Sequence, residues 1–504
     1  MRLSALAMIL ASSAMTLLPN VEVRAQPVAV PETPGTQNNI ESDLVSAAIA
    51  QEYNLPIEEA RRQADLVQLF EEQAAKVSEN FPGALIASIV QHGSDFNITV
   101  VFDRDVKLAA LRPYVTDELR PYIRVKRSPF TRQQIAAAKG QLAKALGTVP
   151  DSISVSYDPT QEKYVVWVAE EVDLEQAQRL VPERFRSRVE FRRGVSETLV
   201  GVDGNADTPT TAGRTAYFGG WPLFERGTAR CTGGFTVWNT QTQTAGILTA
   251  GHCGNTSIGF RYPLDGSTMA LGNATQERFP GYYDFQIHYS STMGTNGSVW
   301  LDNDVSGQYY INCNVRIETC QTRTFRNRYA ALAVPQYVAV TDAVTGVPIQ
   351  SDLGWNPNHP INATRCKYGR MSGIVCGRII ASEIDGEARD ANGEPVGSTN
   401  SFVRVEPYSS YTATTIPGDS GGPVFSSLVV PSSGSPTLTA AGVLSGGRLL
   451  GTGLLTVGLR SRPCIANSDT GCFFDYMPID RINDSSYPVG ILRNGTTYQA
   501  IDVK

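Results

Sequence analysis

The spacing of hydrophobic and polar residues changes character near residue 200. Before that point, apolar residues recur at three- and four-residue steps over residues 41–80 and 131–146, which predicts amphipathic helices, the second capped by Thr131. Residues 97–102 have the pattern of a strand, and residues 153–157 and 164–168 predict a hairpin around the turn between them. This half of the chain is therefore expected to be an α+β module.

Helical periodicity nearly vanishes beyond the polar, glycine-rich segment 201–213, which has the composition of a linker open to proteolytic nicking. Short β-rich runs follow, separated by Gly, Pro, Asn and Ser; examples are residues 235–238, 285–289, 337–340 and 441–444. Such spacing is typical of an all-β barrel or sandwich. The second half is therefore expected to be a different, all-β domain.

Composition supports the same division. The chain of 504 residues is long enough for two or three domains, and its net charge of −6 with no basic cluster argues against nucleic-acid binding. Six of the eight lysines precede residue 200, whereas all eight cysteines lie beyond residue 230. The N-terminal part contains no set of catalytic side chains, and its one histidine, His92, is expected to be an ordinary surface or packing residue.

The N-terminus predicts export. Arg2 precedes an apolar run over residues 3–18, and Val23-Arg24-Ala25 offers a cleavage point before residue 26. A membrane anchor is the alternative, but the run contains three serines and is short for a membrane span. Residues 1–25 are therefore predicted to be a signal peptide, and the mature protein is expected to be secreted without a membrane partner.

The even number of cysteines in an exported chain favours disulfide bonds. Zinc is the competing interpretation, but the sequence has no Cys-x-x-Cys pair and no histidine-rich partner, so no metal and no cofactor are expected. Cys253 could tie the loop that carries His252 to Cys231.

Ser420 lies in the segment TIPGDSGGPV, which contains the Gly-x-Ser-x-Gly pattern of an α/β-hydrolase nucleophile but could also be a plain glycine-rich turn. A serine nucleophile needs a histidine base, and in α/β-hydrolases that histidine follows the serine. The four histidines, at positions 92, 252, 288 and 359, all precede Ser420. The α/β-hydrolase interpretation is therefore excluded.

His252 is the favoured base, because small residues surround it at the end of a β-type run, while His288 is expected on a strand face and His359 in a loop. Asp284 lies among aromatic strand-forming residues, where a charge is costly unless it is paired. Asp302 and Asp304 are alternatives, but residues 301–304 have the pattern of an exposed turn. Asp284 is therefore the favoured carboxylate.

The order TAGHC, YDFQI, GDSGGP resembles that of the chymotrypsin-type serine proteases. Residues 230–237, 366–377, 442–447 and 473–478 resemble the streptogrisin and α-lytic protease branch, and the part before residue 200 is similar to its pro-domain. The resemblance implies two six-stranded antiparallel β-barrels preceded by an α+β pro-domain.

The resemblance also implies the domain order. Residues 26–200 would be the pro-region, 201–216 a linker and processing region, and 217–504 the protease domain, with an insertion near 291–345. The chain would be a secreted serine endopeptidase, made as a pre-pro-protein and expected to be a monomer, with proteins or peptides as substrates. Its pro-domain would act as an intramolecular chaperone and inhibitor. A catalytically inactive binding protein of the same fold, or an esterase using the same triad, are the alternatives.

Specific roles follow from the resemblance. Ser420 would attack the substrate, His252 would transfer the proton and Asp284 would hold the imidazolium. Other implied roles are an oxyanion hole from the N–H groups of Gly418 and Ser420, support of the aspartate by Ser445, substrate pairing by Ser445, Gly446 and Gly447, a structural Asp419–Lys367 ion pair, and the disulfide Cys366–Cys376. We further expect disulfides Cys313–Cys320 within the insertion and Cys464–Cys472 within a local loop.

Overall fold

The computed structural model describes residues 44–147, 154–170 and 172–194, and, with gaps, residues 197–302, 328–335, 359–478 and 498–500. Several sequence expectations lie outside the described residues: the leader 1–25, the linker 201–213, the strand 337–340 and the pair Cys313–Cys320. None of the described helices is both long and apolar enough to span a membrane.

The predicted helical segment 41–80 forms two helices, α1 (Leu44–Tyr53) and α2 (Ile57–Asn80). Asn54 has a left-handed conformation with a φ of 50°, and Pro56 occupies the N-cap position of α2. A proline has no N–H and cannot continue a helix from the preceding turn. The break therefore has a local cause that the apolar periodicity alone did not reveal.

Helix α2 packs on a three-stranded sheet of order β1-β2-β3, made of β1 (Leu85–Gln91), β2 (Asn97–Phe102) and β3 (Ile123–Arg127). The strand predicted at residues 97–102 is confirmed. Short helices α3 (Leu108–Leu111) and η1 (Arg120–Tyr122) connect β2 to β3. Phe70, Ala74 and Val77 on α2 share a buried core with Phe102 on β2.

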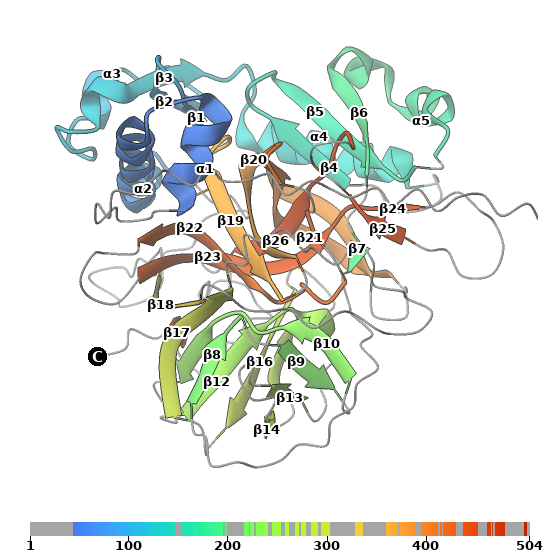
Figure 1. Ribbon diagram of the computed structural model, residues 1–504. Helices are drawn as coiled ribbons and strands as arrows, with labels where there is room; N and C mark the ends of the chain where they lie inside the picture. The colour runs from blue at the N-terminus through green and yellow to red at the C-terminus, as the bar shows by residue number, and fades with distance from the viewer. Residues whose placement is uncertain are drawn as a thin grey trace, which may run out of the picture.

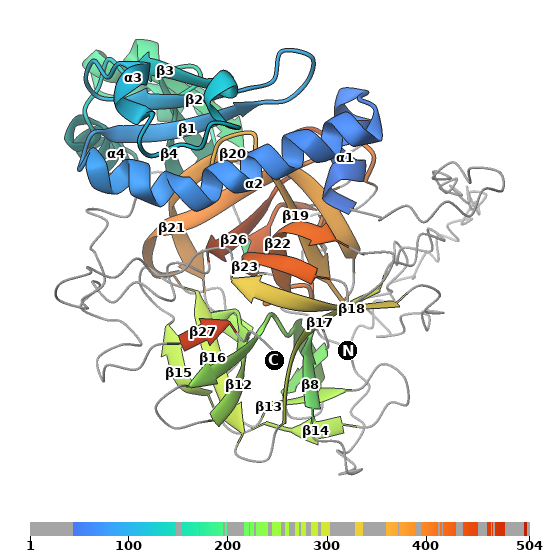
Figure 2. The same cartoon turned by 90° about the vertical axis from the view of Figure 1, so that its left-hand side faces the viewer.

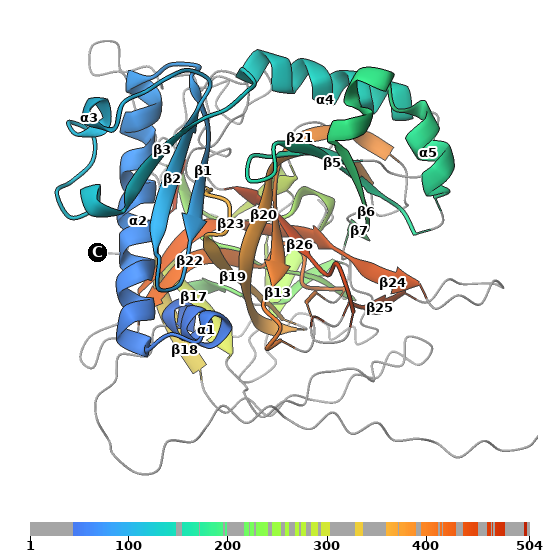
Figure 3. The same cartoon turned by 90° about the horizontal axis from the view of Figure 1, so that it is seen from above.

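Helix α2 and the sheet β1-β2-β3 form a first lobe, and a second lobe is built on α4 (Arg132–Leu146). Thr131 caps α4 as predicted, and it forms a reciprocal capping box with Gln134. Strands β4 (Ser154–Asp158) and β5 (Lys163–Val168) form the predicted antiparallel hairpin, and β6 (Val189–Arg193) adds in parallel to β5. In the chain, α5 (Leu174–Leu180) and η2 (Glu183–Arg188) come between β5 and β6. The two lobes lie on opposite sides when the molecule is seen from above (Figure 3).

The C-terminal half contains a closed six-stranded barrel, with strands in the order β19-β20-β21-β26-β23-β22 and back to β19 (Figure 1). Its strands are β19 (Thr364–Gly369), β20 (Gly373–Arg389), β21 (Pro395–Pro407), β22 (Pro423–Val429), β23 (Thr437–Gly447) and β26 (Phe474–Pro478). Val424, Ala441 and Tyr476 are among its buried residues.

Two further sheets lie below this barrel in Figure 1, with strand orders β10-β9-β13-β14 and β15-β16-β12-β11-β27. Their strands are β9 (Pro222–Glu225), β10 (Thr228–Thr232), β11 (Thr236–Asn239), β12 (Thr244–Thr249), β13 (Ile258–Arg261), β14 (Thr268–Ala270), β15 (Ala274–Arg278), β16 (Phe285–Ser290) and β27 (Tyr498–Ala500). Within the described strands, backbone pairing does not join the two sheets into a second closed barrel.

Strands β17 (Gly294–Asp302) and β18 (Arg328–Pro335) pair with each other and connect β8 (Ala216–Gly219) to β23. They lie in the predicted insertion, and Leu301 and Asp302 belong to β17, so the turn expected at residues 301–304 is wrong for these two positions. Asp304 lies outside the described residues. The remaining short strands are β7 (Glu197–Thr198), β24 (Leu449–Gly451) and β25 (Ser461–Pro463).

The N-terminal unit, residues 44–194, lies on the closed barrel. Figure 2 shows α1 and α2 crossing beside β19 and β22, and Ile49 and Ala60 share a core with Tyr368 and Phe425. At this joint between the N-terminal unit and the closed barrel, Arg365 lies 2.7 Å from the carboxylate of Glu71, and both side chains are 1% exposed. A charge buried without a partner is costly, so this pair favours one relative placement of the two units.

The long β20–β21 hairpin extends beyond the barrel toward the second lobe. Its Asp385 pairs with Val155 of β4, so the sheet β4-β5-β6 continues into the barrel sheet. Lys139 of α4 adds a hydrogen bond of 2.7 Å to the carbonyl of Glu383. The N-terminal unit is therefore held both by side chains and by a backbone pairing.

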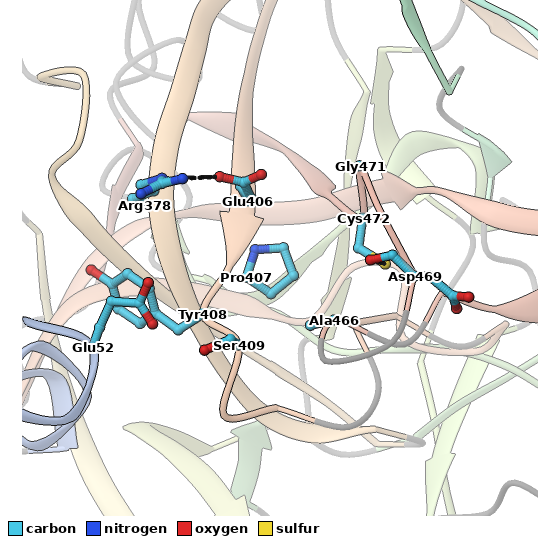
Figure 4. A pocket seen from close by; sticks show the side chains of 10 residues that line it. All are labelled: Glu52, Arg378, Glu406, Pro407, Tyr408, Ser409, Ala466, Asp469, Gly471 and Cys472. Carbon is cyan, nitrogen blue, oxygen red and sulfur yellow. Dashed lines mark hydrogen bonds and ion pairs between the residues drawn. The ribbon is translucent and has the colours of Figure 1, made fainter.

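A polar cavity of about 190 Å³ also lies at the joint (Figure 4). Glu52 of α1 borders it from one side, Arg378 and Glu406 form an ion pair in its wall, and Gly471 and Cys472 border the other side. The Arg378–Glu406 pair is partly exposed, so it contributes little to stability. The cavity thus combines residues from both units, and no catalytic candidate borders it.

Candidate active site

His252 lies in the single turn η3 (Gly251–Cys253) directly after β12. The disulfide Cys231–Cys253 ties this turn to β10, and the His252 side chain is fully buried. Strand β12 leads the chain into this turn, and the disulfide fixes the position of the turn. Together they hold the imidazole in one place.

Asp284 immediately precedes β16, which pairs with β12, so strand pairing brings the carboxylate to the histidine. His252 Nδ1 lies 2.8 Å from Asp284 Oδ2, and the backbone N–H of His252 donates to Oδ1 over 3.0 Å. The hydroxyl of Ser445 also donates to Oδ2. The expected support of Asp284 by Ser445 is thus present as a contact.

The electrostatics of Asp284 balance two opposed effects. Burial raises the pKa of this carboxyl, whereas the positive charge of His252 and the hydrogen bonds from His252 and Ser445 lower it. The net result is a pKa below the ordinary value, so Asp284 stays ionised near neutral pH. An ionised Asp284 fixes the tautomer of His252, with the proton on Nδ1 and a lone pair on Nε2.

Ser420 completes the chain of contacts. Its Oγ lies 2.8 Å from His252 Nε2, and the carbonyl of Ser445 offers a second acceptor at 3.1 Å. A hydroxyl has one proton, and the shorter contact favours donation to Nε2, which is the acceptor left by the tautomer. The structure therefore brings together Asp284, His252 and Ser420, although 168 positions separate the last two.

The turn around Ser420 is fixed from several sides. Gly418 has a φ of +103°, a conformation that residues with a side chain rarely adopt. Its carbonyl accepts a 2.8 Å hydrogen bond from the Thr232 hydroxyl, and the N–H of Gly421 donates to Leu444. The backbone of this turn is therefore fixed by contacts within the chain.

The Asp419 side chain belongs to a buried polar cluster. Its carboxylate lies 3.0 Å from Lys367 Nζ, accepts the N–H of Ser372 over 3.1 Å and also accepts the Ser372 hydroxyl. Lys367 in turn donates to Ser372. Lys367 and Asp419 are both fully buried, and the structure thus places the two members of the expected ion pair in contact.

Two residues of the site had no signal in the sequence. Thr232 donates to Gly418 and accepts the N–H of Arg370, and Ser372 joins Lys367 to Asp419. Thr232 follows Cys231, and Ser372 lies in the loop between Cys366 and Cys376. No recurring sequence pattern distinguishes either residue. Only the tertiary fold brings them to the turn.

Gly446 and Gly447 at the end of β23 pair with β7. Gly446 is opposite Thr198 and Gly447 is opposite Glu197 in antiparallel register. The Thr415 hydroxyl is buried beside Gly447 and has no hydrogen-bond partner among the described residues. The short strand β7, which follows the N-terminal unit in the chain, thus lies along the end of the strand that contains Ser445.

The other three histidines are buried and lie outside this chain of contacts. His288 is buried on β16, and His359 is buried in a loop with its Nδ1 2.8 Å from the Tyr476 hydroxyl. Burial lowers the pKa of His92 to about 4, and its Nδ1 contacts Gln63. The disulfides Cys366–Cys376 and Cys464–Cys472 are present as expected.

One group of potential metal ligands occurs within the described part of the chain: Cys464, Asp469 and Cys472. The two sulfurs are bonded to each other, and a disulfide offers no thiolate to a metal. This group is therefore a structural loop.

The chain matches no family model and no curated protein. It resembles several solved structures over about half of its length. Nocardiopsis protease (NAPase) is 20% identical with a TM-score of 0.30, over 54% of this chain and 96% of that one. Protease A of Thermobifida fusca is 19% identical with a TM-score of 0.29, over 53% and 94%, and an α-lytic protease homologue is 20% identical with a TM-score of 0.29, over 53% and 94%.

These TM-scores lie below 0.5, so any function of the chain has to be inferred from the geometry of the site. The closed six-stranded barrel with further sheets beside it fits a chymotrypsin-like fold. By name, all three solved structures are proteases or a protease homologue.

Proposed function

We propose that this chain is the precursor of a secreted serine endopeptidase with two chymotrypsin-like barrels. The observation that carries the proposal is the continuous contact from Asp284 through His252 to Ser420. A serine hydroxyl is a weak nucleophile, and this arrangement of base and carboxylate is what activates it.

In the proposed reaction, Ser420 Oγ attacks the carbonyl carbon of a peptide bond while its proton passes to His252 Nε2. The ionised Asp284 stabilises the imidazolium, and the N–H groups of Gly418 and Ser420 stabilise the negative oxygen. His252 then gives the proton to the leaving amine, which leaves an acyl group on Ser420. Water, deprotonated by His252, releases the acid product and restores the serine.

The strand pairing of β7 with Gly446 and Gly447 supports a peptide as substrate. An extended peptide that forms backbone hydrogen bonds with a strand edge is a general mode of recognition, which a small ester could not use. An esterase with the same triad is therefore the weaker alternative. A non-catalytic binding protein is disfavoured because the three reacting groups are in contact.

A direct test is labelling of the secreted, processed protein with a fluorophosphonate probe, together with a casein digest. We expect labelling and cleavage for the natural chain, and neither for Ser420→Ala, because the probe and the substrate both need the serine oxygen. Absence of labelling in the natural chain would contradict the enzyme proposal. Labelling without casein cleavage would point to an esterase or to a protease of narrow specificity.

We further propose that residues 26–200 are a pro-region that inhibits and helps to fold the protease, after a signal peptide at 1–25 and before a processing region at 201–216. The position of Glu197 and Thr198 beside the β23 edge supports inhibition, because a substrate would need the same edge. Three disulfides support folding in an oxidising compartment.

Removal of residues 26–200, with the signal kept, should leave little active enzyme in the medium, because non-local strand pairing forms slowly without a template. Activity against casein per amount of secreted protein is the measurement. Expression of residues 26–200 as a separate chain in the same cells should restore activity, and is the control. Efficient secretion of active enzyme from the deleted chain alone would refute the folding role.

A further inference from the structure

Arg448 follows Gly447 directly, at the end of the strand that pairs with β7. Its backbone N–H donates to the carbonyl of Phe473 over 3.1 Å, so the start of its side chain is fixed next to β26. The guanidinium donates through Nη1 to the carbonyl of Thr470 over 2.6 Å. Arg448 is therefore a buried cation at the edge of the proposed substrate strand, only 6% exposed.

The N-terminal unit supplies the counter-charge for this cation. Arg448 Nη2 forms an ion pair with the carboxylate of Glu170, which follows β5, while the Arg448 Nε has no hydrogen-bond partner among the described residues. The Glu170 side chain is about half exposed and the Arg448 side chain is 8% exposed. The C-terminal half thus holds the arginine in place, and Glu170 of the N-terminal unit balances its charge.

The N-terminal unit also covers Arg448. Gly194 has a φ of +113°, and a Cβ at this position would lie 2.8 Å from Arg448 Cδ and 2.8 Å from Phe473 Cε1. A side chain there would need the arginine to move, so the close cover depends on glycine. Departure of the N-terminal unit would remove both the cover and the carboxylate.

The register of β7 gives the position of Arg448 relative to a substrate. If the residue opposite Ser445 provides the scissile carbonyl, Thr198 corresponds to the second residue upstream of the cut and Glu197 to the third. Arg448 itself would lie opposite the fourth substrate residue upstream of the cut. Its side chain extends from there to Gly194, which corresponds to the sixth upstream residue. A substrate side chain at one of these three positions would meet Arg448.

We propose that Arg448 determines specificity in the mature enzyme, by binding a substrate carboxylate four to six residues upstream of the cut. This inference rests on the proposed protease function. In the precursor, Glu170 takes the place of that carboxylate. A guanidinium presents paired donors that match a carboxylate, and a partly buried arginine without a partner is costly, so an acidic substrate residue replaces what the N-terminal unit removes.

The test uses enzyme matured from the full-length chain and fluorogenic peptides that differ only by Glu or Gln at the fourth, fifth or sixth upstream position. We expect kcat/KM to be about tenfold higher for Glu at one of the three positions, in the range of a hydrogen bond to a charged group. The preference should fall as salt rises from roughly 0.05 to 1 M, because ions screen the pair.

Arg448→Gln should abolish the ratio between the Glu and Gln peptides, and Arg448→Lys should keep part of it. Arg378→Gln, which breaks an ion pair in the cavity of Figure 4, is the matched control and should keep the full ratio. No preference for Glu at any position, or a preference that survives Arg448→Gln, would overturn the inference. Cleavage of no peptide and absence of fluorophosphonate labelling would instead overturn the proposed protease function.

Discussion

Replacing Asp284 with asparagine should lower kcat by about 10⁴-fold with the fold intact, an effect of the size known for such aspartates. The amide is nearly the same size as the carboxylate but carries no charge, so it does not stabilise the imidazolium. It also no longer compels His252 to keep its proton on Nδ1, where the contact to Asp284 is now 2.8 Å. The measurement is steady-state hydrolysis of one peptide substrate at pH 8.

Asp302→Asn is the matched control, since Asp302 is the alternative carboxylate from the sequence and lies at the end of β17. We expect this variant to keep near-normal kcat. A thermal melt of both variants separates lost chemistry from lost folding. Equal loss of activity in the two variants, or near-normal activity in Asp284→Asn, would contradict the assigned role of Asp284.

Replacing Lys367 with methionine should lower the free energy of unfolding by about 3–5 kcal/mol, the usual cost of breaking a buried ion pair from one side. Methionine fills most of the lysine volume but leaves the fully buried Asp419 carboxylate without its counter-charge. Since Asp419 adjoins Ser420, the turn should also shift and activity should fall. Denaturant unfolding in a Ser420→Ala background prevents self-digestion during the measurement.

Arg378→Met provides the comparison, because it breaks a partly exposed ion pair that should be worth about 1 kcal/mol or less. The double variant Lys367→Met, Asp419→Leu removes both buried charges and should regain part of the lost stability. If Lys367→Met unfolds no more easily than Arg378→Met, the ion pair does not hold the turn.

Local features of the fold were predictable because their causes are local. The Thr131 cap, the β4–β5 hairpin and the strand at residues 97–102 each follow from neighbouring residues. The absence of a histidine after Ser420 excluded an α/β-hydrolase, the small residues around His252 favoured it as the base, and Asp284 was favoured because a charge among aromatic residues is costly unless it is paired. Each of these features can be seen in the sequence without the tertiary fold.

Features that depend on distant parts of the chain were not predictable. Thr232 holds the carbonyl of Gly418 across 186 positions, and a lone threonine has no pattern that reveals such a contact. The pairing of β7 with β23 is equally invisible, since two residues are too short for a periodicity. The break before α2 was overlooked because the apolar spacing continues through Pro56.

The backbone pairing between β4 and the β20–β21 hairpin has a consequence for the separated halves. While the N-terminal unit is in place, β20 has a neighbour at Asp385. If it leaves, as the proposed pro-region would, this stretch of β20 becomes an open strand edge, and such edges recruit other extended chains. Reassociation with an intact N-terminal unit would be favoured at that edge, so destruction of the released unit, more than its departure, would make activation irreversible.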